Sequence, residues 1–159
     1  MAKVGSFILA EKLRLEGEYE KASQYYKDCV SLAIKTGSIK DELEARIKLE
    51  LILWNLGQLK ESEDYYLHAM SLAKSSALKD REKECRAALD ILNLYNEAKE
   101  FRLKGSYEDS IEYFRKAILI AKNINSSDHE LKCLRQLSLC YWDQNSFQEF
   151  YNLNNLTLP

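Results

Sequence analysis

Three stretches of seventeen residues in this chain align without a gap, and they restrict its fold more than any other feature. They begin at Gly17, Gly57 and Gly105 and read GEYEKASQYYKDCVSLA, GQLKESEDYYLHAMSLA and GSYEDSIEYFRKAILIA. Each continues from its glycine to an apolar residue, a small residue, an aromatic pair and a closing alanine. Self-similarity at a spacing of a few tens of residues is typical of repeat architectures. The pattern therefore predicts stacked repeats and favours binding over catalysis.

The remaining sequence predicts helical hairpins throughout. The only proline is the terminal Pro159, and alternation typical of strands is absent, so long helices can form without interruption. We expect the first helices of four pairs at residues 3–15, 40–55, 80–103 and 128–143, and the second helices at 18–36, 58–75, 106–123 and 146–154. Asn145 stands where a fourth glycine would fall, and asparagine is the residue that best replaces glycine in a left-handed turn.

The spacing of the turns is uneven. It is 40 residues from Gly17 to Gly57, 48 from Gly57 to Gly105, and 40 again to Asn145. We expect the eight extra residues in an elongated helix over 80–103, with a longer loop at residues 75–78 as the alternative. The patterns Ser127-x-x-Glu130 and Ser146-x-x-Glu149 are typical of capping boxes, in which the serine hydroxyl accepts from a free helix amide.

The spacing that the three stretches share also predicts how the two helices of a hairpin pack. Two helices approach closely where one contributes small side chains, and Ala22, Ser62 and Ser110 occupy that place. The aromatic pair follows three and four residues later, on the same helix face. We expect the first members, Tyr25, Tyr65 and Tyr113, to lie near the contact between repeats with their hydroxyls reaching water.

Composition excludes several classes of protein. The net charge of −2 offers no overall attraction to a polyanion, so a nucleic-acid partner is not expected. No apolar stretch approaches the ~20 residues that span a bilayer, so a membrane partner is not expected either. The four cysteines show no metal-ligand spacing, and Cys133 and Cys140 are too far apart on one helix for a disulfide. We expect reduced, buried thiols and a cytoplasmic location.

These residues together resemble the tetratricopeptide repeat (TPR) family in its long-period form of about 40 residues per unit. The resemblance rests on the glycine, the tyrosine, the small residue, the aromatic and the alanine, and on small residues seven positions before the turn at Ala10, Ala98 and Ser138. It implies an all-α fold, a right-handed α–α superhelix (solenoid) of about four TPR-like repeats and eight helices. It also implies a single domain over 1–159, with repeats at approximately 3–36, 40–75, 80–123 and 128–158.

The chain departs from the family pattern at Glu50, at Glu97, where a leucine is usual, and in its last segment. Glu50 replaces the small residue in the second repeat, and we expect Arg46, one helical turn earlier, to pair with it. The last segment, 147–158, loses the aromatic and alanine positions and is too apolar for the polar outer face of a terminal cap. We expect an array cut from a longer protein, with this segment exposed or used in self-association.

By resemblance, the first helices line a concave groove that binds a peptide or protein segment. The expected groove residues are Phe7, Glu11, Arg14, Ile47, Leu51, Trp54, Tyr95, Lys99, Arg102, Arg135, Leu139 and Trp142. The lysine and asparagine with which some family members clamp a terminal carboxylate are not in place, which disfavours a chaperone adaptor. The alternative is a regulatory or architectural segment of a larger signalling, protease or transcription-regulator protein.

No catalytic motif accompanies these residues. The two histidines, His68 and His129, lie far apart in sequence, and the carboxylates are scattered at helix-surface spacing. The sequence patterns typical of nucleotide-binding sites, of zinc sites and of activated serine nucleophiles do not occur. We therefore expect a non-enzymatic protein without cofactor or metal.

Overall fold

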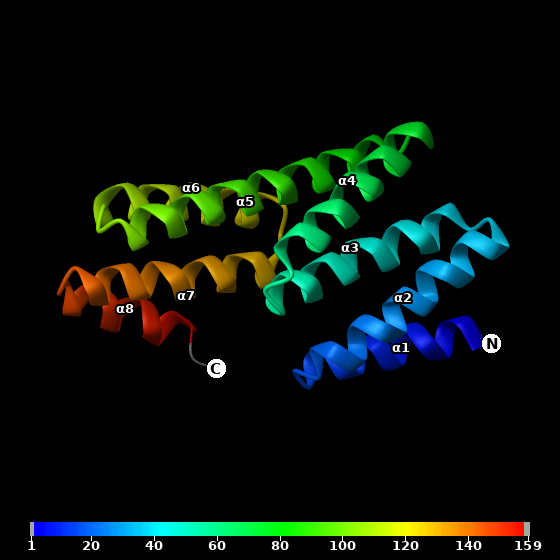
Figure 1. Ribbon diagram of the computed structural model, residues 1–159, viewed down its shortest axis with the longest axis horizontal. Coiled ribbons are helices and arrows are strands. Elements are labelled where there is room, and N and C mark those ends of the chain that lie inside the picture. The colour runs from blue at the N-terminus through cyan, green and yellow to red at the C-terminus, as the bar shows by residue number, and fades with distance from the viewer. Residues whose placement is uncertain (1, 158–159) are drawn as a thin grey trace. The chain divides into compact units, whose positions relative to one another are not determined.

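A computed structural model describes residues 2–157, which form eight α-helices and no strand. The helices are α1 (Ala2–Leu15), α2 (Tyr19–Thr36), α3 (Ile39–Asn55), α4 (Leu59–Ser75), α5 (Lys79–Leu103), α6 (Tyr107–Asn123), α7 (Ser127–Asp143) and α8 (Phe147–Thr157). Consecutive helices fold back on one another as hairpins (Figure 1). The all-α fold of helical hairpins is confirmed, and the expected helix limits are met within one or two residues except at α8, which is longer than predicted.

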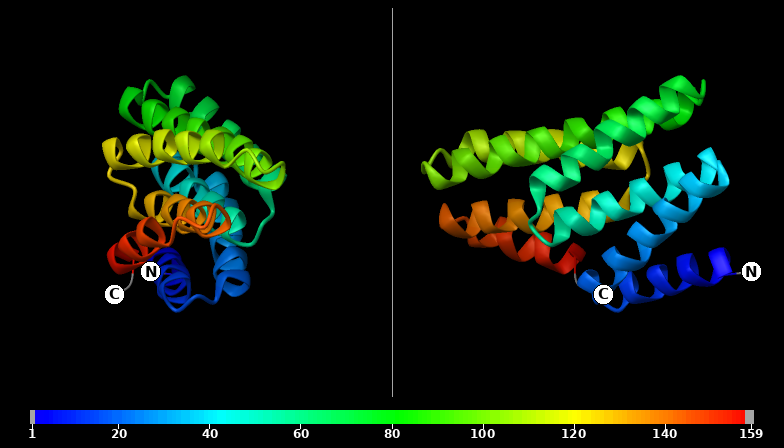
Figure 2. Two further views of the ribbon diagram at one scale, coloured as in Figure 1. Left: turned by 90° about the vertical axis from the view of Figure 1, so that its left-hand side faces the viewer. Right: turned by 45° about the vertical axis from the view of Figure 1, so that its right-hand side comes forward.

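The chain divides into two compact units, Met1–Arg86 and Ala87–Pro159. The first unit contains α1 to α4 and the start of α5, and the second contains the rest of α5 with α6, α7 and α8. In the second unit, α7 lies beside both α6 and α8 (Figure 2). The single domain over 1–159 and the right-handed superhelical winding stay predictions.

The long helix α5 absorbs the uneven spacing of the repeats. It has 25 residues, against 17 in α3 and in α7, the other first helices of the later hairpins. The linker before it, residues 76–78, is no longer than the other linkers. The elongated helix is therefore confirmed, and the alternative of a longer loop is wrong.

A residue with positive φ stands at every turn between two helices. Within the hairpins these are Gly17, Gly57, Gly105 and Asn145, with φ of +78°, +77°, +79° and +60°. In the turn after α5, the amide of Ser106 donates to the Phe101 carbonyl at 2.9 Å, and Gly105 donates to Arg102 at 3.0 Å. These bonds satisfy the last carbonyls of the helix, as in a Schellman turn. The prediction that Asn145 takes the place of a glycine is confirmed.

The small residues make the close contacts predicted for them. Ala22, Ser62 and Ser110 are fully buried. The Ser62 hydroxyl donates to the Glu50 carbonyl of α3 at 3.2 Å, and the Ser110 hydroxyl donates to the Ala98 carbonyl of α5 at 2.7 Å. Each serine hydroxyl is thus hydrogen-bonded to the backbone of the partner helix, which offsets the cost of burying a polar group.

The second aromatic of each pair fills the interior of its unit. Tyr26, Tyr66 and Phe114 are at most 1% exposed. In the first unit, Tyr26 packs with Leu49, Ile52 and Leu53 of α3. Tyr25, Tyr65 and Tyr113, the first members, are only partly buried, in keeping with their expected position at a boundary.

Two expected polar contacts are wrong. Arg46 pairs with Glu42, at 2.8 Å, and not with Glu50, because Glu50 turns into the interior and meets the Ser62 hydroxyl at 3.4 Å. The N-cap of α7 is Ser126 and not Ser127, and no side chain caps its amides. The Ser126 hydroxyl instead contacts Nδ1 of the buried His129 at 2.5 Å.

The state of the cysteines and the apolar character of the helices can be compared with what the composition predicts. Cys29, Cys85, Cys133 and Cys140 are all buried and free of disulfides, as expected. Within the described part of the chain, no helix combines the length and apolar character needed to cross a bilayer.

Candidate functional site

Six of the twelve expected groove residues lie in the first unit, and packing occupies most of them. Trp54 is 1% exposed and Leu51 is 8% exposed. Phe7 is half-buried and meets the Tyr26 ring edge-on, with 5.4 Å between centroids. Ile47 packs against the cluster around Leu43. These four side chains support the fold and leave little surface for a ligand.

The two charged members on α1 belong to an internal network. Glu11 accepts hydrogen bonds from the Tyr26 hydroxyl and from the Arg14 guanidinium, at 3.1 Å for the latter. The Lys48 ammonium of α3 lies 3.9 Å from the same carboxylate. Burial by itself would raise the pKa of Glu11, but the hydrogen bonds and the nearby cations lower it below its usual value. The first unit therefore presents a satisfied polar cluster.

The Glu11 network also explains the state of Tyr26. Burial and the hydrogen bond to Glu11 raise the pKa of the Tyr26 hydroxyl well above its ordinary value. The phenol is thus a permanent donor, and it holds the α1 carboxylate against α2. The arrangement stabilises the hairpin.

The second unit arranges its charges differently, around the ring of Tyr95. This ring is 4% exposed and meets Phe114 edge-on at 5.6 Å. The ammonium of Lys99, from α5, and that of Lys132, from α7, lie 5.8 and 5.9 Å from the Tyr95 centroid. Burial raises the pKa of Tyr95 to about 12, so the ring is neutral at pH 7. Two cations from different helices therefore converge on one aromatic ring.

Arg102 is neutralised by a carboxylate, as Arg14 is in the first unit. Its Nε donates to Asp143 at 2.7 Å, and its terminal nitrogen donates to Gln136 at 3.4 Å. This link fastens the end of α5 to the end of α7.

The most open expected residues follow one side of α7. Arg135, Leu139 and Trp142 are spaced at four and three residues, so they share a helix face. Leu139 is 37% exposed, Trp142 is 49% exposed and Arg135 is also exposed. With Lys132, which lies one turn before Arg135 and approaches Tyr95 of α5, these residues form a surface that we call the α7 face.

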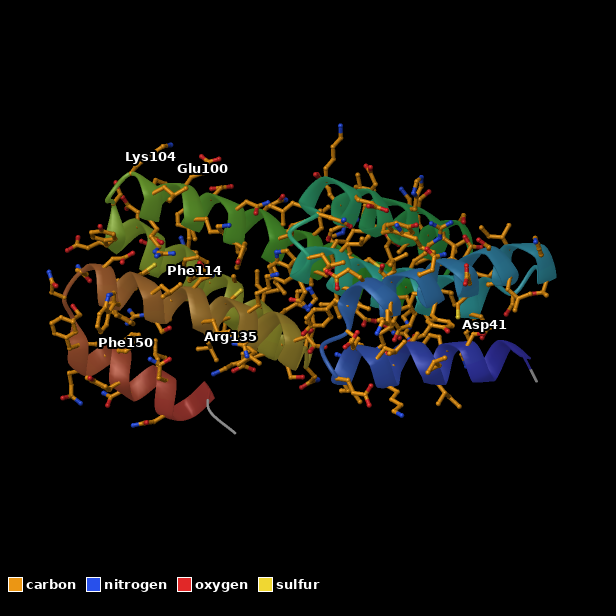
Figure 3. All side chains as sticks on the ribbon, turned by 60° about the horizontal axis from the view of Figure 1, so that its bottom comes forward. Asp41, Glu100, Lys104, Phe114, Arg135 and Phe150 are labelled. Atoms are coloured by element: carbon orange, nitrogen blue, oxygen red, sulfur yellow. The ribbon has the colours of Figure 1, made fainter. Side chains whose placement is uncertain are left out.

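Aromatic side chains of α8 hold the exposed indole in place. Trp142 contacts Phe147 at 5.3 Å and Phe150 at 5.0 Å between ring centroids. Figure 3 shows Phe150 on α8 directed toward α7. Because its neighbours restrict its rotamers, Trp142 would lose little conformational entropy on contact with a partner.

Lys132 is not among the groove residues expected from the sequence. The signal was available, because Lys132 precedes Arg135 by three residues and Leu139 by seven, which places all three on one side of a helix. Its approach to Tyr95 depends on how α5 and α7 pack and could not be read from spacing alone.

Comparison with known proteins identifies the repeats. The profile of the Tetratricopeptide repeat family matches residues 8–33, 51–76 and 91–124, which together cover more than half of the chain. No curated protein matches the chain in sequence.

Solved structures of low sequence identity also match the chain. One is BtubC (BKLC) from P. vanneervenii, with 15% identity and a TM-score of 0.48 over 98% of this chain. Another is a Podosopora anserina protein described as a kinesin light chain with nearly identical TPR-like repeats, with 16% identity and a TM-score of 0.43 over 96% of this chain. The chain spans 61% of the first structure and 72% of the second.

Proposed function

This chain belongs to the tetratricopeptide repeat family, whose repeats generally mediate protein–protein interaction, and from that premise we propose that it is a non-catalytic scaffold. It binds a peptide or protein segment along the first helices of its hairpins. The α7 face supplies the anchoring contacts. The proposed location is the cytoplasm, which suits four free thiols.

The observation that supports this proposal is the exposure of Leu139 and Trp142 beside Arg135 on one side of α7. Tryptophan and arginine are the residue types that most often dominate the energy of protein interfaces. The aromatic support from α8 gives Trp142 the rigidity of a preformed anchor. A single exposed apolar residue needs no explanation, but a rigid apolar pair next to a cation is typical of an interface centre.

A peptide-display selection on the full chain, followed by calorimetry with the best peptide, tests this function. Trp142→Ala should weaken binding by about 30-fold, since a central aromatic anchor contributes about 2 kcal/mol. Leu119→Ala is the matched control, because Leu119 is a 62% exposed apolar residue on α6. Its affinity should equal that of the unmodified chain.

Two results would count against the scaffold proposal. One is a selection that yields no peptide above background. The other is an equal loss of affinity in Trp142→Ala and Leu119→Ala, which would mean that no particular face is used. Circular dichroism of both variants separates loss of the surface from loss of the fold.

A second role is favoured by the exposed rings of α8. Phe147 is 45% exposed and Tyr151 is 59% exposed. In this regulatory or architectural role, another domain of the same parent protein or a second copy of the chain covers α8. Sedimentation equilibrium tests the second copy: Tyr151→Glu should convert a concentration-dependent dimer into a monomer. A monomer before the substitution would exclude self-association.

A further inference from the structure

A carboxyl group lies in the interior of the first unit. Glu50 of α3 is fully buried, whereas the residues at the same distance before the other hairpin glycines, Ala10 and Ala98, are small and apolar. A buried carboxyl costs free energy unless hydrogen bonds replace its contacts with water. Alanine at this position would avoid that cost, so stability alone does not explain Glu50.

Two hydroxyls of α4 meet this carboxyl. Ser62 is fully buried, and its hydroxyl lies 3.4 Å from Oε1 of Glu50 and 3.2 Å from the Glu50 carbonyl. Tyr66 is 1% exposed and forms a hydrogen bond with the Glu50 side chain. Burial and the interaction with Glu50 raise the pKa of Tyr66 well above its ordinary value, so the phenol keeps its proton and can donate it. The buried carboxyl of α3 thus meets two particular positions of α4.

The second helices of the other hairpins do not repeat this pair of hydroxyls. Ser62 and Tyr66 stand five and nine residues after the turn glycine Gly57. At the same two positions, the other second helices have Ala22 and Tyr26 in α2, Ser110 and Phe114 in α6, and Phe150 and Asn154 in α8. The positions are equivalent in the structure as well, because the Ser110 hydroxyl donates to the Ala98 carbonyl as Ser62 does to Glu50. Only α4 therefore carries a hydroxyl at both positions.

We propose that Glu50, Ser62 and Tyr66 form a pairing lock, in which the carboxyl of α3 selects the one second helix that carries both hydroxyls. The repeats are similar in sequence, so the apolar faces of several second helices resemble one another. Against a helix with the pattern of α2 or α6, the carboxyl would be buried with one hydroxyl fewer, which costs free energy. The lock selects α4 as the hairpin partner by penalising the alternatives. This device goes beyond the proposed scaffold function and does not depend on which partner binds.

Substitutions that give α4 the hydroxyl pattern of another helix test the lock in the full chain. Ser62→Ala reproduces the pattern of α2, and Tyr66→Phe reproduces that of α6. Each should raise the equilibrium constant of unfolding about 10- to 100-fold in urea denaturation, because the buried carboxyl loses a partner. In the background of Glu50→Ala, the effect of each substitution should be about 10-fold smaller, since the carboxyl is gone. Glu50→Ala itself should fold, because alanine occupies this position in the first and third hairpins.

Transfer of the lock to the third hairpin provides an independent measurement. Ala98→Glu places a carboxyl at the equivalent position of α5, where Ser110 is present and Phe114 lacks the second hydroxyl. This change should raise the equilibrium constant of unfolding, and adding Phe114→Tyr should recover at least about 10-fold of the loss. Phe114→Tyr in the intact chain is the matched control. It should give no gain, because it buries a hydroxyl opposite an alanine.

Two results would overturn the pairing lock. One is additivity in the first set, in which Ser62→Ala and Tyr66→Phe have the same effect with and without Glu50→Ala, because the hydroxyls would then act independently of the carboxyl. The other is an equal effect of Phe114→Tyr in the presence and absence of Ala98→Glu. If one set includes a variant that circular dichroism shows to be unfolded, the other set decides, since the two place their changes in different hairpins.

Discussion

Ala77 stands at the turn between α4 and α5 with φ of +57°, where the other turns have glycine or asparagine. A side chain at positive φ crowds the backbone, so this alanine is strained. Ala77→Gly should therefore raise the free energy of unfolding by about 1 kcal/mol, measured by urea denaturation.

The reverse substitution is the matched control. Gly105 has φ of +79°, and a Cβ placed there would meet no other atom within 4 Å. Gly105→Ala should lower the free energy of unfolding by about 1 kcal/mol through backbone strain alone. Stability unchanged in both variants would show that the turns are not left-handed at these residues.

His129 makes the second unit sensitive to acid. Its side chain is 4% exposed, and burial together with the charge of Lys132 lowers its pKa to about 4. The unfolded chain binds a proton near pH 6.5, and the folded chain binds it only near pH 4. Stability should therefore be complete above pH 6.5 and fall by up to about 1.4 kcal/mol per unit as the pH drops toward 4.

Denaturation curves of the intact chain and of His129→Gln, taken between pH 6.5 and 4.5, measure this effect. The variant should lose the pH dependence in that interval, whatever its stability at pH 7. Carboxylates whose pKa is lowered, such as Glu11, stabilise the fold throughout this interval and lose that contribution only at more acidic pH. A slope that persists unchanged in His129→Gln would assign the acid sensitivity to another group.

At the scale of the element, α5 carries the irregularity of the repeat. It runs without a break from Lys79 to Leu103, through the point where the two compact units divide. Asp90 is exposed in the middle of this helix, so its side chain contributes little to packing. Asp90→Pro should cost about 3 kcal/mol or more of stability, because it removes a backbone hydrogen bond and clashes with the preceding turn.

Asp90→Ala is the control for the helix-breaking variant. It removes the same carboxylate and keeps the backbone amide, so it should leave stability unchanged or slightly higher. Equal stability of the proline and alanine variants would place a loop where α5 is continuous.

The helices were predictable because their signals are local. Glycine, asparagine and the absence of internal proline act on the residues next to them, so the limits of α5 could be read from the spacing of Gly57 and Gly105. The partners of Arg46 and Ser126 could not be read in this way. Each has several possible partners within one helical turn, and the packing of α3 or α7 selects among them.

In the whole molecule, residues at equivalent positions of the repeats differ in exposure. Trp54 and Trp142 both stand three residues before a hairpin turn, yet Trp54 is 1% exposed and Trp142 is 49% exposed. Equivalent positions in the sequence are equivalent along the helix, but their burial depends on what packs around each hairpin. The sequence therefore predicts both tryptophans as groove residues, and it does not show which indole is accessible to a partner.

This difference gives the chain a built-in reporter of binding, because Trp54 and Trp142 are its only tryptophans. Trp54→Phe leaves the exposed indole as the sole tryptophan, and Trp142→Phe leaves the buried one. Both variants have to retain the helical content of the intact chain, which circular dichroism measures.

A peptide partner that lies on the α7 face should cover Trp142, and quenching of tryptophan fluorescence by acrylamide measures that coverage. When a peptide selected on the intact chain is added to saturation, the Trp142 fluorescence of Trp54→Phe should shift to shorter wavelength and become protected from the quencher. The Trp54 fluorescence of Trp142→Phe should not change at any peptide concentration. A peptide that saturates Trp54→Phe and leaves Trp142 fully accessible to acrylamide would show that the partner does not lie on the α7 face.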